Sequence, residues 1–470
     1  MKGDLEFNNC DEYDRLLERG VDDKKACRKQ ILAAFLASLM SFSSGTVVAG
    51  WTKTTSYKND DGLTIITQTE TSWIVSSYVL GALIGALPAG RLSHKYGPKR
   101  LLLWLAVPMT VGWLLPLVDI NNVLFICIGR FTCGLSLGAT TVVLPLYAGA
   151  VSSDTLRGRT GVFLDFMMCA GILFAYVTRS WLPGFREFHI VCSLIPIAFA
   201  AVFNWMPESP SYLYFVGKYE KASRAMRWLR GRSFNIREEF NRLDRSQWTN
   251  KSISKTRIDK KVMHKAVIIS FGLVLAQRLS GAGGVIQYTV NLFEMTGALI
   301  DPNTASIIVG VFQLVASWVS ILLIDRTGRR TLLLISSSVI TVCLAMLTCY
   351  FYLLHRGDLA DSPWKYASLV IVCVFISGFR LGLGPIPWFM VTELISSKDS
   401  GRVQSVMASF SWFLSFLIMK TFKFLIQQNA TALWLSCTVY SAAGLAFILF
   451  YVPETNNKSR EQIQAELSID

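Results

Sequence analysis

The sequence predicts an all-α membrane protein in which twelve transmembrane helices form two six-helix bundles, joined by a short cytosolic helical linker. Composition, the number of long apolar runs and an internal repeat support this fold class. Apolar residues make up 52% of the 470 residues, charged residues only 17%, and the mean hydropathy is +0.41. A soluble chain carries roughly 25% charged residues, so this composition excludes a soluble enzyme and a disordered chain.

Twelve runs are apolar and long enough to cross a bilayer, which takes about 20 helical residues. They lie at 31–51, 72–90, 100–118, 122–148, 161–178, 188–206, 264–293, 304–324, 331–354, 366–392, 403–426 and 432–452. The polar residues 1–30 lack the apolar core of a signal peptide, so we expect a cytosolic tail there. We place the two bundles at 31–206 and 264–452, the linker at 207–263 and a C-terminal tail at 453–470.

The Lys and Arg residues are distributed unevenly between the two sides of the predicted bundles. Segments on the side of the termini hold 35 of the 46, and the opposite loops hold 6. This positive-inside bias predicts a multi-pass cell-membrane protein with both termini in the cytosol. The bias also accounts for the net charge of +14, so we expect the lipid bilayer and no nucleic acid as a partner. The oligomeric state stays open.

Two sequence features recur at matching places in the two halves. Gly90-Arg-Leu-Ser-His-Lys-Tyr-Gly-Pro-Lys-Arg100 follows the second run, and Asp325-Arg-Thr-Gly-Arg-Arg330 follows the eighth. Pro207-Glu-Ser-Pro210 follows the sixth run, and Pro453-Glu-Thr455 follows the twelfth. Such duplication is typical of transporters that expose a midplane site to either side in turn. Residues 221–230 of the linker have the pattern of an amphipathic helix, either a latch across the bundles or a plain solvated linker.

These motifs span roughly 30–460, and in this order they resemble the sugar transporter family of the major facilitator superfamily. The run Pro207-Glu-Ser-Pro-Ser-Tyr-Leu213 and the Gly45…Gly50-Trp51 end of the first span are most similar to insect facilitated trehalose transporters. The resemblance implies the major facilitator fold, no cofactor, and a hexose or trehalose as the small-molecule partner, carried by facilitated diffusion. Two alternatives stay open: a proton-coupled symporter of a sugar or another polar or anionic solute, and a sugar sensor that does not transport.

The resemblance also implies which residues contact the substrate. Residues 277–288 are similar to the family's Q-Q-x-S-G-x-N-x-x-x-Y-Y, and residues 382–388 match G-x-G-P-x-P-W. Amide groups both donate to and accept from sugar hydroxyls, and an indole packs against the C–H surface of a sugar. The candidate substrate-binding residues are Gln277, Arg278, Gln287, Tyr288, Gln313, Trp388, Asp165, Arg380 and Ser411.

Asp165, Arg278 and Arg380 are charged although they lie within predicted spans, at positions that face the substrate in the family. Each charge costs about 2.5–3.5 kcal/mol at mid-membrane on insertion scales, so we expect Asp165 and Arg278 to pair across the cavity. One interpretation is a structural pair that replaces a hydrogen bond between two amides. The other is altered specificity, in which the positive charge left on Arg380 attracts an anionic or strongly polar substrate.

Arg130, in Gly129-Arg-Phe-Thr-Cys-Gly134, is similar to a family arginine that pairs with an aspartate of span 1 in proton-coupled relatives. Ser43 occupies that aspartate position here. Because proton transport needs a titratable group in the membrane, the serine favours facilitated diffusion. Asp165 remains as a candidate proton carrier in the N-terminal half.

The resemblance further implies a set of cytosolic contacts that close the substrate path. These gating candidates are Gly90, Gly97, Arg100, Arg130, Arg157, Glu208, Arg329, Arg330, Glu393, Arg402 and Glu454. In the N-terminal half, His94, Ala150 and Ser211 replace charged residues of the family motifs, so we expect a weaker preference for the outward-open state. No nucleophile–base pair or metal-ligand cluster stands out in the sequence, so we expect neither a catalytic nor a metal site.

Overall fold

The computed structural model describes most of the chain, with gaps in loops and at the termini. The described residues are 3–50, 56–59, 62–65, 67–120, 122–153, 156–182, 184–231, 234–241, 243–244, 257–287, 302–356, 367–395, 397–456, 458 and 460–469. Within these ranges, twelve helices are long and apolar enough to cross a membrane. The predicted fold class and number of spans are therefore confirmed.

Helices α1–α6 pack against one another and form the N-terminal half. Their bounds are α1 Gly3–Ala49, α2 Gln68–Tyr96, α3 Pro98–Leu114, α4 Val123–Val151, α5 Arg157–Trp181 and α6 Phe185–Phe203, with one 3₁₀ turn, η1, at Leu115–Leu117. Helix α2 packs on α4, α1 on α5, and α3 on both α4 and α6. Small residues allow the closest approaches: a Cβ at Gly138 of α4 would collide with the carbonyl oxygen of Ala82 in α2.

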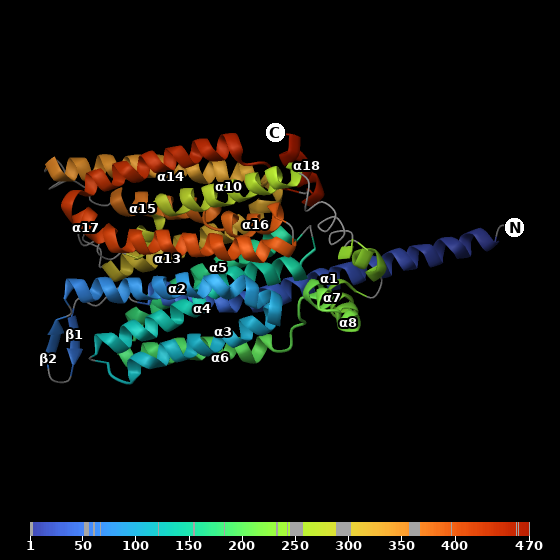
Figure 1. Cartoon of the computed structure of the whole chain (residues 1–470), viewed down its shortest axis with the longest axis horizontal. Helices are drawn as coiled ribbons and strands as arrows, with labels where there is room; N and C mark the ends of the chain where they lie inside the picture. Colours follow the sequence, from blue (N-terminus) through green and yellow to red (C-terminus); the bar gives the residue numbers. More distant parts are fainter. Residues whose placement is uncertain are drawn as a thin grey trace.

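The C-terminal half begins at α10 and lies beside the N-terminal half, with its helices along the same long axis (Figure 1). Its helices are α10 Arg257–Leu279, α11 Ala282–Gln287, α13 Pro302–Thr327, α14 Arg329–Arg356, α15 Ala367–Leu381, α16 Ile386–Leu394 and α17 Ser397–Tyr451. Helix α17 comprises two spans, because the backbone at Asn429 is non-helical (φ −158°, ψ 90°). The halves meet mainly where α2 packs on α17 and α5 packs on α13.

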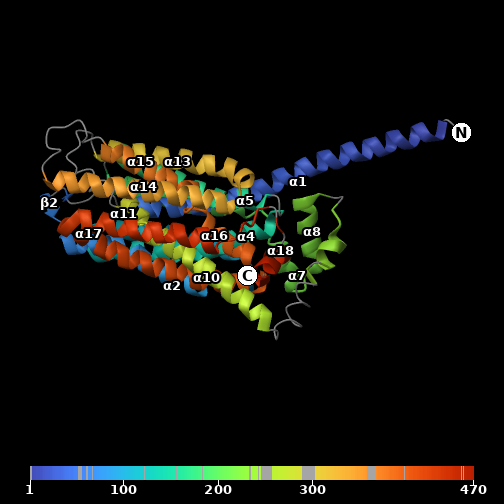
Figure 2. The ribbon, with the colours of Figure 1, turned by 90° about the horizontal axis from the view of Figure 1, so that it is seen from above.

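Short helices gather at one end of the bundle, which we name the α8 end (Figures 1 and 2). They are α7 Pro210–Phe215, α8 Tyr219–Arg230 and α18 Arg460–Ile469. Helix α8 is amphipathic as predicted and buries Ala222, Ala225, Met226 and Leu229. It packs mainly on α7 and α1, and Gln30 Nε2 of α1 donates to the Leu229 carbonyl at 3.2 Å. Its main contacts therefore lie within the N-terminal half and not across both halves.

The first helix extends well beyond the predicted span 31–51 towards the N-terminus. It runs without a break from Gly3 to Ala49, and the segment that qualifies as a span is Lys24–Ala49. The expected boundary at residue 30 is therefore not a helix boundary. Figure 1 shows the first part of α1 extending away from the rest of the molecule at the α8 end.

A β-hairpin lies at the opposite end, which we name the hairpin end (Figure 1). Strands β1 (Ser56–Asn59) and β2 (Gly62–Ile65) pair antiparallel, with Ser56 opposite Ile65 and Asn59 opposite Gly62. The all-α prediction missed this element. The sequence carries a signal for it, because the turn-prone residues 59–62 (NDDG) are followed by Leu-Thr-Ile, which is rich in β-branched residues.

Two spans of the C-terminal half are broken next to the interface between the halves. Helix α10 ends at Leu279, and Gly281 has a φ of 77°, which glycine adopts without the penalty of a Cβ. Helices α15 and α16 are separated by 382–385, where two glycines and Pro385 interrupt the helix. The break at Gly281 shows that the expected continuous span 264–293 is wrong. Broken helices leave backbone carbonyls for side chains to satisfy.

Candidate functional site

A cavity of about 140 Å³ lies between the two halves and receives side chains from both. Ser41 of α1, Tyr78 of α2 and Thr141 of α4 line it on one side, and Met419 of α17 lines it on the other. Of the predicted substrate-binding residues, five line this cavity: Asp165, Gln277, Arg278, Arg380 and Trp388. The fold therefore gathers five of the nine candidate residues around one cavity, although they lie on four helices, α5, α10, α15 and α16.

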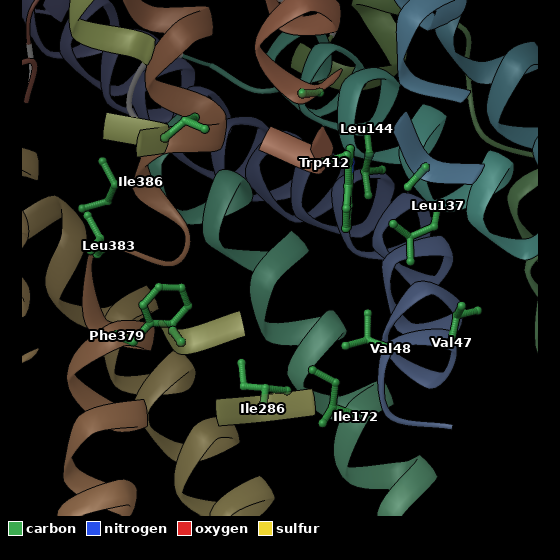
Figure 3. Close-up of a cluster of buried hydrophobic side chains, with 14 of the residues drawn as sticks. Val47, Val48, Leu137, Leu144, Ile172, Ile286, Phe379, Leu383, Ile386 and Trp412 are labelled. Atoms are coloured by element: carbon green, nitrogen blue, oxygen red, sulfur yellow. The ribbon is translucent and has the colours of Figure 1, made fainter. Parts of the chain in front are cut away.

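Much of the cavity wall is apolar. Figure 3 shows Val48, Leu137, Leu144, Ile286 and Phe379 from helices of both halves around this region, and each of them lines the cavity. Apolar walls displace water and strengthen the interactions of the few polar groups that face the same space. The charged side chains of the cavity therefore carry more weight than they would at the protein surface.

Asp165 pairs with Arg380, which corrects the expected Asp165–Arg278 pair. Arg380 Nη1 lies 2.6 Å from Asp165 Oδ1, and the two side chains are only 5% and 9% exposed. Ser317 Oγ donates to Asp165 Oδ2 at 3.2 Å. Arg380, near the end of α15, is therefore the arginine that faces Asp165 of α5. The positive charge left in the cavity is thus on Arg278 and not on Arg380.

Gln313 supports this ion pair instead of lining the cavity. Its Oε1 accepts a hydrogen bond from Arg380 Nη2 at 2.8 Å, and the side chain is fully buried. Arg380 is therefore held by a carboxylate from the N-terminal half and an amide from the C-terminal half. Gln313 is therefore a second acceptor for a buried guanidinium, and its expected contact with a sugar stays a prediction.

Arg278 lies between two indole rings. Its guanidinium carbon is 5.7 Å from the ring centre of Trp388 and 5.1 Å from that of Trp412. Its Nε donates to Ser411 Oγ at 2.6 Å, and among the described residues Arg278 forms no ion pair. The aromatic faces attract the cation, so the two rings stabilise the guanidinium between them without neutralising its charge. Trp412 was missed by the sequence analysis, although it is adjacent to the candidate Ser411.

Gln277 uses its amide nitrogen to satisfy the broken span beside it. Nε2 donates to the carbonyls of Leu383 and Gly384 at 2.8 and 2.7 Å. Its Oε1 is buried and has no hydrogen-bond partner among the described residues. Gln277 lines the cavity, so it brings an acceptor without a partner to the cavity wall. Two further candidates, the side chain of Gln287 and the whole of Tyr288, lie outside the described residues.

Arg130 bonds to backbone carbonyls and not to a carboxylate. Nε donates to the carbonyl of Ile74 in α2 at 2.8 Å, and Nη2 donates to that of Val47 in α1 at 3.4 Å. The guanidinium also lies 4.9 Å from the ring centre of Tyr78. Ser43, at the position of the expected aspartate, is buried and its Oγ has no partner among the described residues. Arg130 therefore ties α4 to α2 and α1.

Comparison with known proteins places this arrangement in a family. A family model described as "Sugar (and other) transporter" matches residues 30–467. The facilitated trehalose transporter Tret1 of Bombyx mori is 34% identical over 469 residues, covering 97% of this chain and 91% of the relative. That of Culex quinquefasciatus is 33% identical, covering 94% and 86%. The chain belongs to the sugar transporter family. The predicted resemblance to insect facilitated trehalose transporters is confirmed.

Solved structures agree with the fold. The proton:xylose symporter XylE, bound to 6-bromo-6-deoxy-D-glucose, aligns with a TM-score of 0.81 at 19% identity, covering 95% of this chain and all of that one. A partially occluded inward-open structure of XylE from E. coli gives 0.73, covering 92% and 99%. The major facilitator fold is therefore confirmed. The chain is a multi-pass membrane protein of a transporter family and not an enzyme.

The repeated motifs of this family have the same geometry in both halves. Gly97 and Gly328 each have a positive φ, 96° and 88°, between consecutive helices. A Cβ on Gly97 would crowd the carboxylate of Glu208, and one on Gly328 would crowd that of Glu454. This glycine–glutamate contact joins the second, third and sixth spans of each half. It explains why both residues recur in the sequence, as Gly97 with Glu208 and as Gly328 with Glu454.

Each of these glutamates caps the N-terminus of a helix. Glu208 accepts hydrogen bonds from the backbone N–H groups of Lys99 and Arg100 at 2.9 and 3.3 Å. Burial raises the pKa of the Glu208 carboxyl, and the backbone hydrogen bonds offset only part of that shift. A carboxylate at this position satisfies helix N–H groups that have no partner within the helix and complements the helix dipole.

Glu454 caps α14 in the same way, with the N–H groups of Arg329 and Arg330 at 2.9 and 3.0 Å. We expect Glu454→Gln to lower the free energy of unfolding by about 1.5–3 kcal/mol, because the amide nitrogen opposes one N–H and the charge is lost. Thermal unfolding of the purified protein measures the change. Glu466→Gln, which removes a half-exposed carboxylate paired with Lys458, is the control and leaves the melting temperature unchanged. Equal melting temperatures in the Glu454→Gln and Glu466→Gln variants would contradict the capping role of Glu454.

Gating candidates of the C-terminal half form an ion-pair network at the α8 end, and the expected asymmetry between the halves stays a prediction. In the C-terminal half, buried Arg329 lies 3.4 Å from Glu393 and 3.6 Å from Asp325, and Thr455 Oγ1 donates to Glu393 at 2.7 Å. In the N-terminal half, Ala150 has no group to form such contacts. Arg402 is exposed, and the side chain of Arg157 lies outside the described residues.

Contacts between the halves occur at both ends of α2. At the α8 end, the N–H of Gly90 donates to Ser405 Oγ at 2.8 Å, and Arg159 of α5 forms a 2.8 Å ion pair with Asp325 of α13. At the hairpin end, Lys420 Nζ lies 3.6 Å from the ring centre of Trp73. The sequence analysis missed the Arg159–Asp325 pair, because nothing in the sequence says which residues of the two halves face each other. The expected weaker preference for the outward-open state stays a prediction.

Proposed function

We propose that this protein carries a sugar, a hexose or trehalose, down its concentration gradient by alternating access. The observation that supports the proposal is the cavity between the two repeated halves, which combines the indole of Trp388, the free amide oxygen of Gln277 and apolar walls. The trehalose transporters among the relatives suggest the substrate class. We further propose a cell-membrane location with both termini in the cytosol, since the α8 end carries the Lys- and Arg-rich segments.

Facilitated diffusion is favoured over proton coupling by the partners of the buried charges. Arg130 hydrogen-bonds to carbonyls, and Ser43 stands where a carboxylate is expected in coupled relatives. Asp165, the other candidate proton carrier, is 2.6 Å from Arg380. This carboxylate is therefore already engaged in an ion pair that joins the two halves of the protein. A membrane pH gradient should therefore leave transport unchanged.

Counterflow in reconstituted vesicles tests both statements. Vesicles loaded with unlabelled glucose or trehalose should transiently accumulate the labelled sugar, to the same extent with and without a pH gradient. Trp388→Ala should lower the initial rate roughly two- to tenfold, because stacking on an aromatic face contributes about 0.5–1.5 kcal/mol. Trp181→Ala, at a side chain that is 81% exposed, is the control. Binding without counterflow would overturn the proposal in favour of a sensor.

A further inference from the structure

Three charged groups in the central cavity leave it with one uncompensated positive charge. Asp165 and Arg380 form a buried ion pair with no net charge, whereas Arg278 forms no ion pair among the described residues. Arg130 adds positive potential from behind Tyr78, which lines the same cavity. The cavity is therefore cationic, although a neutral sugar requires no charge.

The three arginines near the cavity differ in how their donors are used. Arg130 donates through Nε and Nη2 to two carbonyls, and Arg380 donates through Nη1 and Nη2 to a carboxylate and an amide. Arg278 donates through Nε to Ser411, and neither of its Nη groups makes a hydrogen bond to a described residue. Arg380 thus has both Nη groups hydrogen-bonded and Arg130 has one, whereas buried polar groups retained for packing alone usually have partners. The Nη groups of Arg278 are thus left for a ligand.

The environment of Arg278 suits a planar anion. Trp388 and Trp412 contact the guanidinium and restrict its orientation, and the Nε hydrogen bond to Ser411 fixes its rotation. The two Nη groups of a fixed guanidinium match the two oxygens of a carboxylate in a bidentate pair. Gln277, one residue earlier, offers a buried acceptor without a partner for a neighbouring hydroxyl group.

We propose that the cavity binds a monoanionic sugar acid, a uronate or an aldonate, with its carboxylate on the Nη groups of Arg278 and its hydroxyls towards Gln277. One negative charge makes the occupied cavity neutral. A sugar phosphate, with a charge near −2, would leave it negative in apolar surroundings. The inference rests on the proposed transport function and names its substrate class.

Competition and uptake in reconstituted vesicles test the proposal. Glucuronate should inhibit glucose counterflow at a concentration at least tenfold below that at which unlabelled glucose does so. Labelled glucuronate should itself enter, and an inside-positive membrane potential should increase its accumulation and not that of glucose. Arg278→Gln, which restores the family amide, should lower the ratio of glucuronate to glucose uptake at least tenfold. Arg278→Lys keeps the positive charge but lacks the two parallel Nη donors of the guanidinium, so it should give an intermediate ratio.

The controls separate this inference from the proposed function. Arg186→Gln removes an exposed positive charge outside the cavity and should leave the ratio unchanged. Suppose that the vesicles show glucose counterflow, but glucuronate neither inhibits it nor enters the vesicles. That result would overturn the sugar-acid inference and would leave the sugar transport proposal standing. Wild-type vesicles that move neither glucose, trehalose nor glucuronate would overturn both. If Arg278→Gln does not fold, the wild-type competition and potential measurements decide alone.

Discussion

Replacing Asp165 by asparagine will destabilise the protein by about 3–5 kcal/mol, because Arg380 is left buried without its counter-ion. The guanidinium is 5% exposed and has only Gln313 as a further described acceptor for its Nη groups. The effect is measured as a fall in the melting temperature of the purified protein. Glu220→Gln, which breaks the exposed pair with Arg224, is the matched control and should change stability by less than about 1 kcal/mol.

A second substitution identifies the partner of Asp165. Asp165→Asn combined with Arg380→Gln should recover most of the lost stability, since neutral groups of similar size remove the uncompensated charge. Asp165→Asn combined with Arg278→Gln should not, because Arg278 bonds to Ser411 and stacks on two tryptophans. Equal recovery in the two double variants would show that Asp165 is shared between both arginines and would refute the assignment.

Replacing Gly90 by valine will slow transport while the protein stays folded. A side chain at Gly90 would collide with the carbonyl of Gly401, which belongs to the other half. Overpacking costs about 1–3 kcal/mol. Here it destabilises only the conformation in which the two halves are in contact at the α8 end. The equilibrium should therefore shift roughly 5–150-fold towards the state that is open at that end.

Spin labels on unnatural amino acids at the exposed positions Lys95 and Arg326 report the separation of the halves at the α8 end. In Gly90→Val, the population at short distance should fall and counterflow should slow. Gly138→Val makes a comparable collision with the carbonyl of Ala82, but both residues lie in the N-terminal half. That variant should lose folded protein without a change in the distances. A short distance retained in Gly90→Val would contradict the gating role of this contact.

The sequence predicts much of the fold because the bilayer imposes a simple rule on it. Each span must satisfy its backbone hydrogen bonds as a helix and must be apolar over about 20 residues, so a hydropathy count finds all twelve. The repeat of Gly97 and Glu208 as Gly328 and Glu454 survives in the sequence, because the close contact admits no Cβ and the helix N-terminus requires an acceptor. Two helix boundaries were predicted wrongly. The first helix continues through residue 30, where the composition changes but the helix does not end. Span 7 ends at Leu279, because Gly281 breaks the helix.

By itself, the sequence determined the family, the twelve spans, the duplicated halves and the presence of three charges in the membrane. Only the tertiary structure decided how those charges are paired. Asp165 and Arg380 lie 215 residues apart and meet through the packing of α5, α13 and α15, which no local pattern encodes. A buried carboxylate neutralises the guanidinium that packing brings within hydrogen-bond distance, which here is that of Arg380. The unpaired positive charge of the cavity is therefore on Arg278 and not, as predicted, on Arg380.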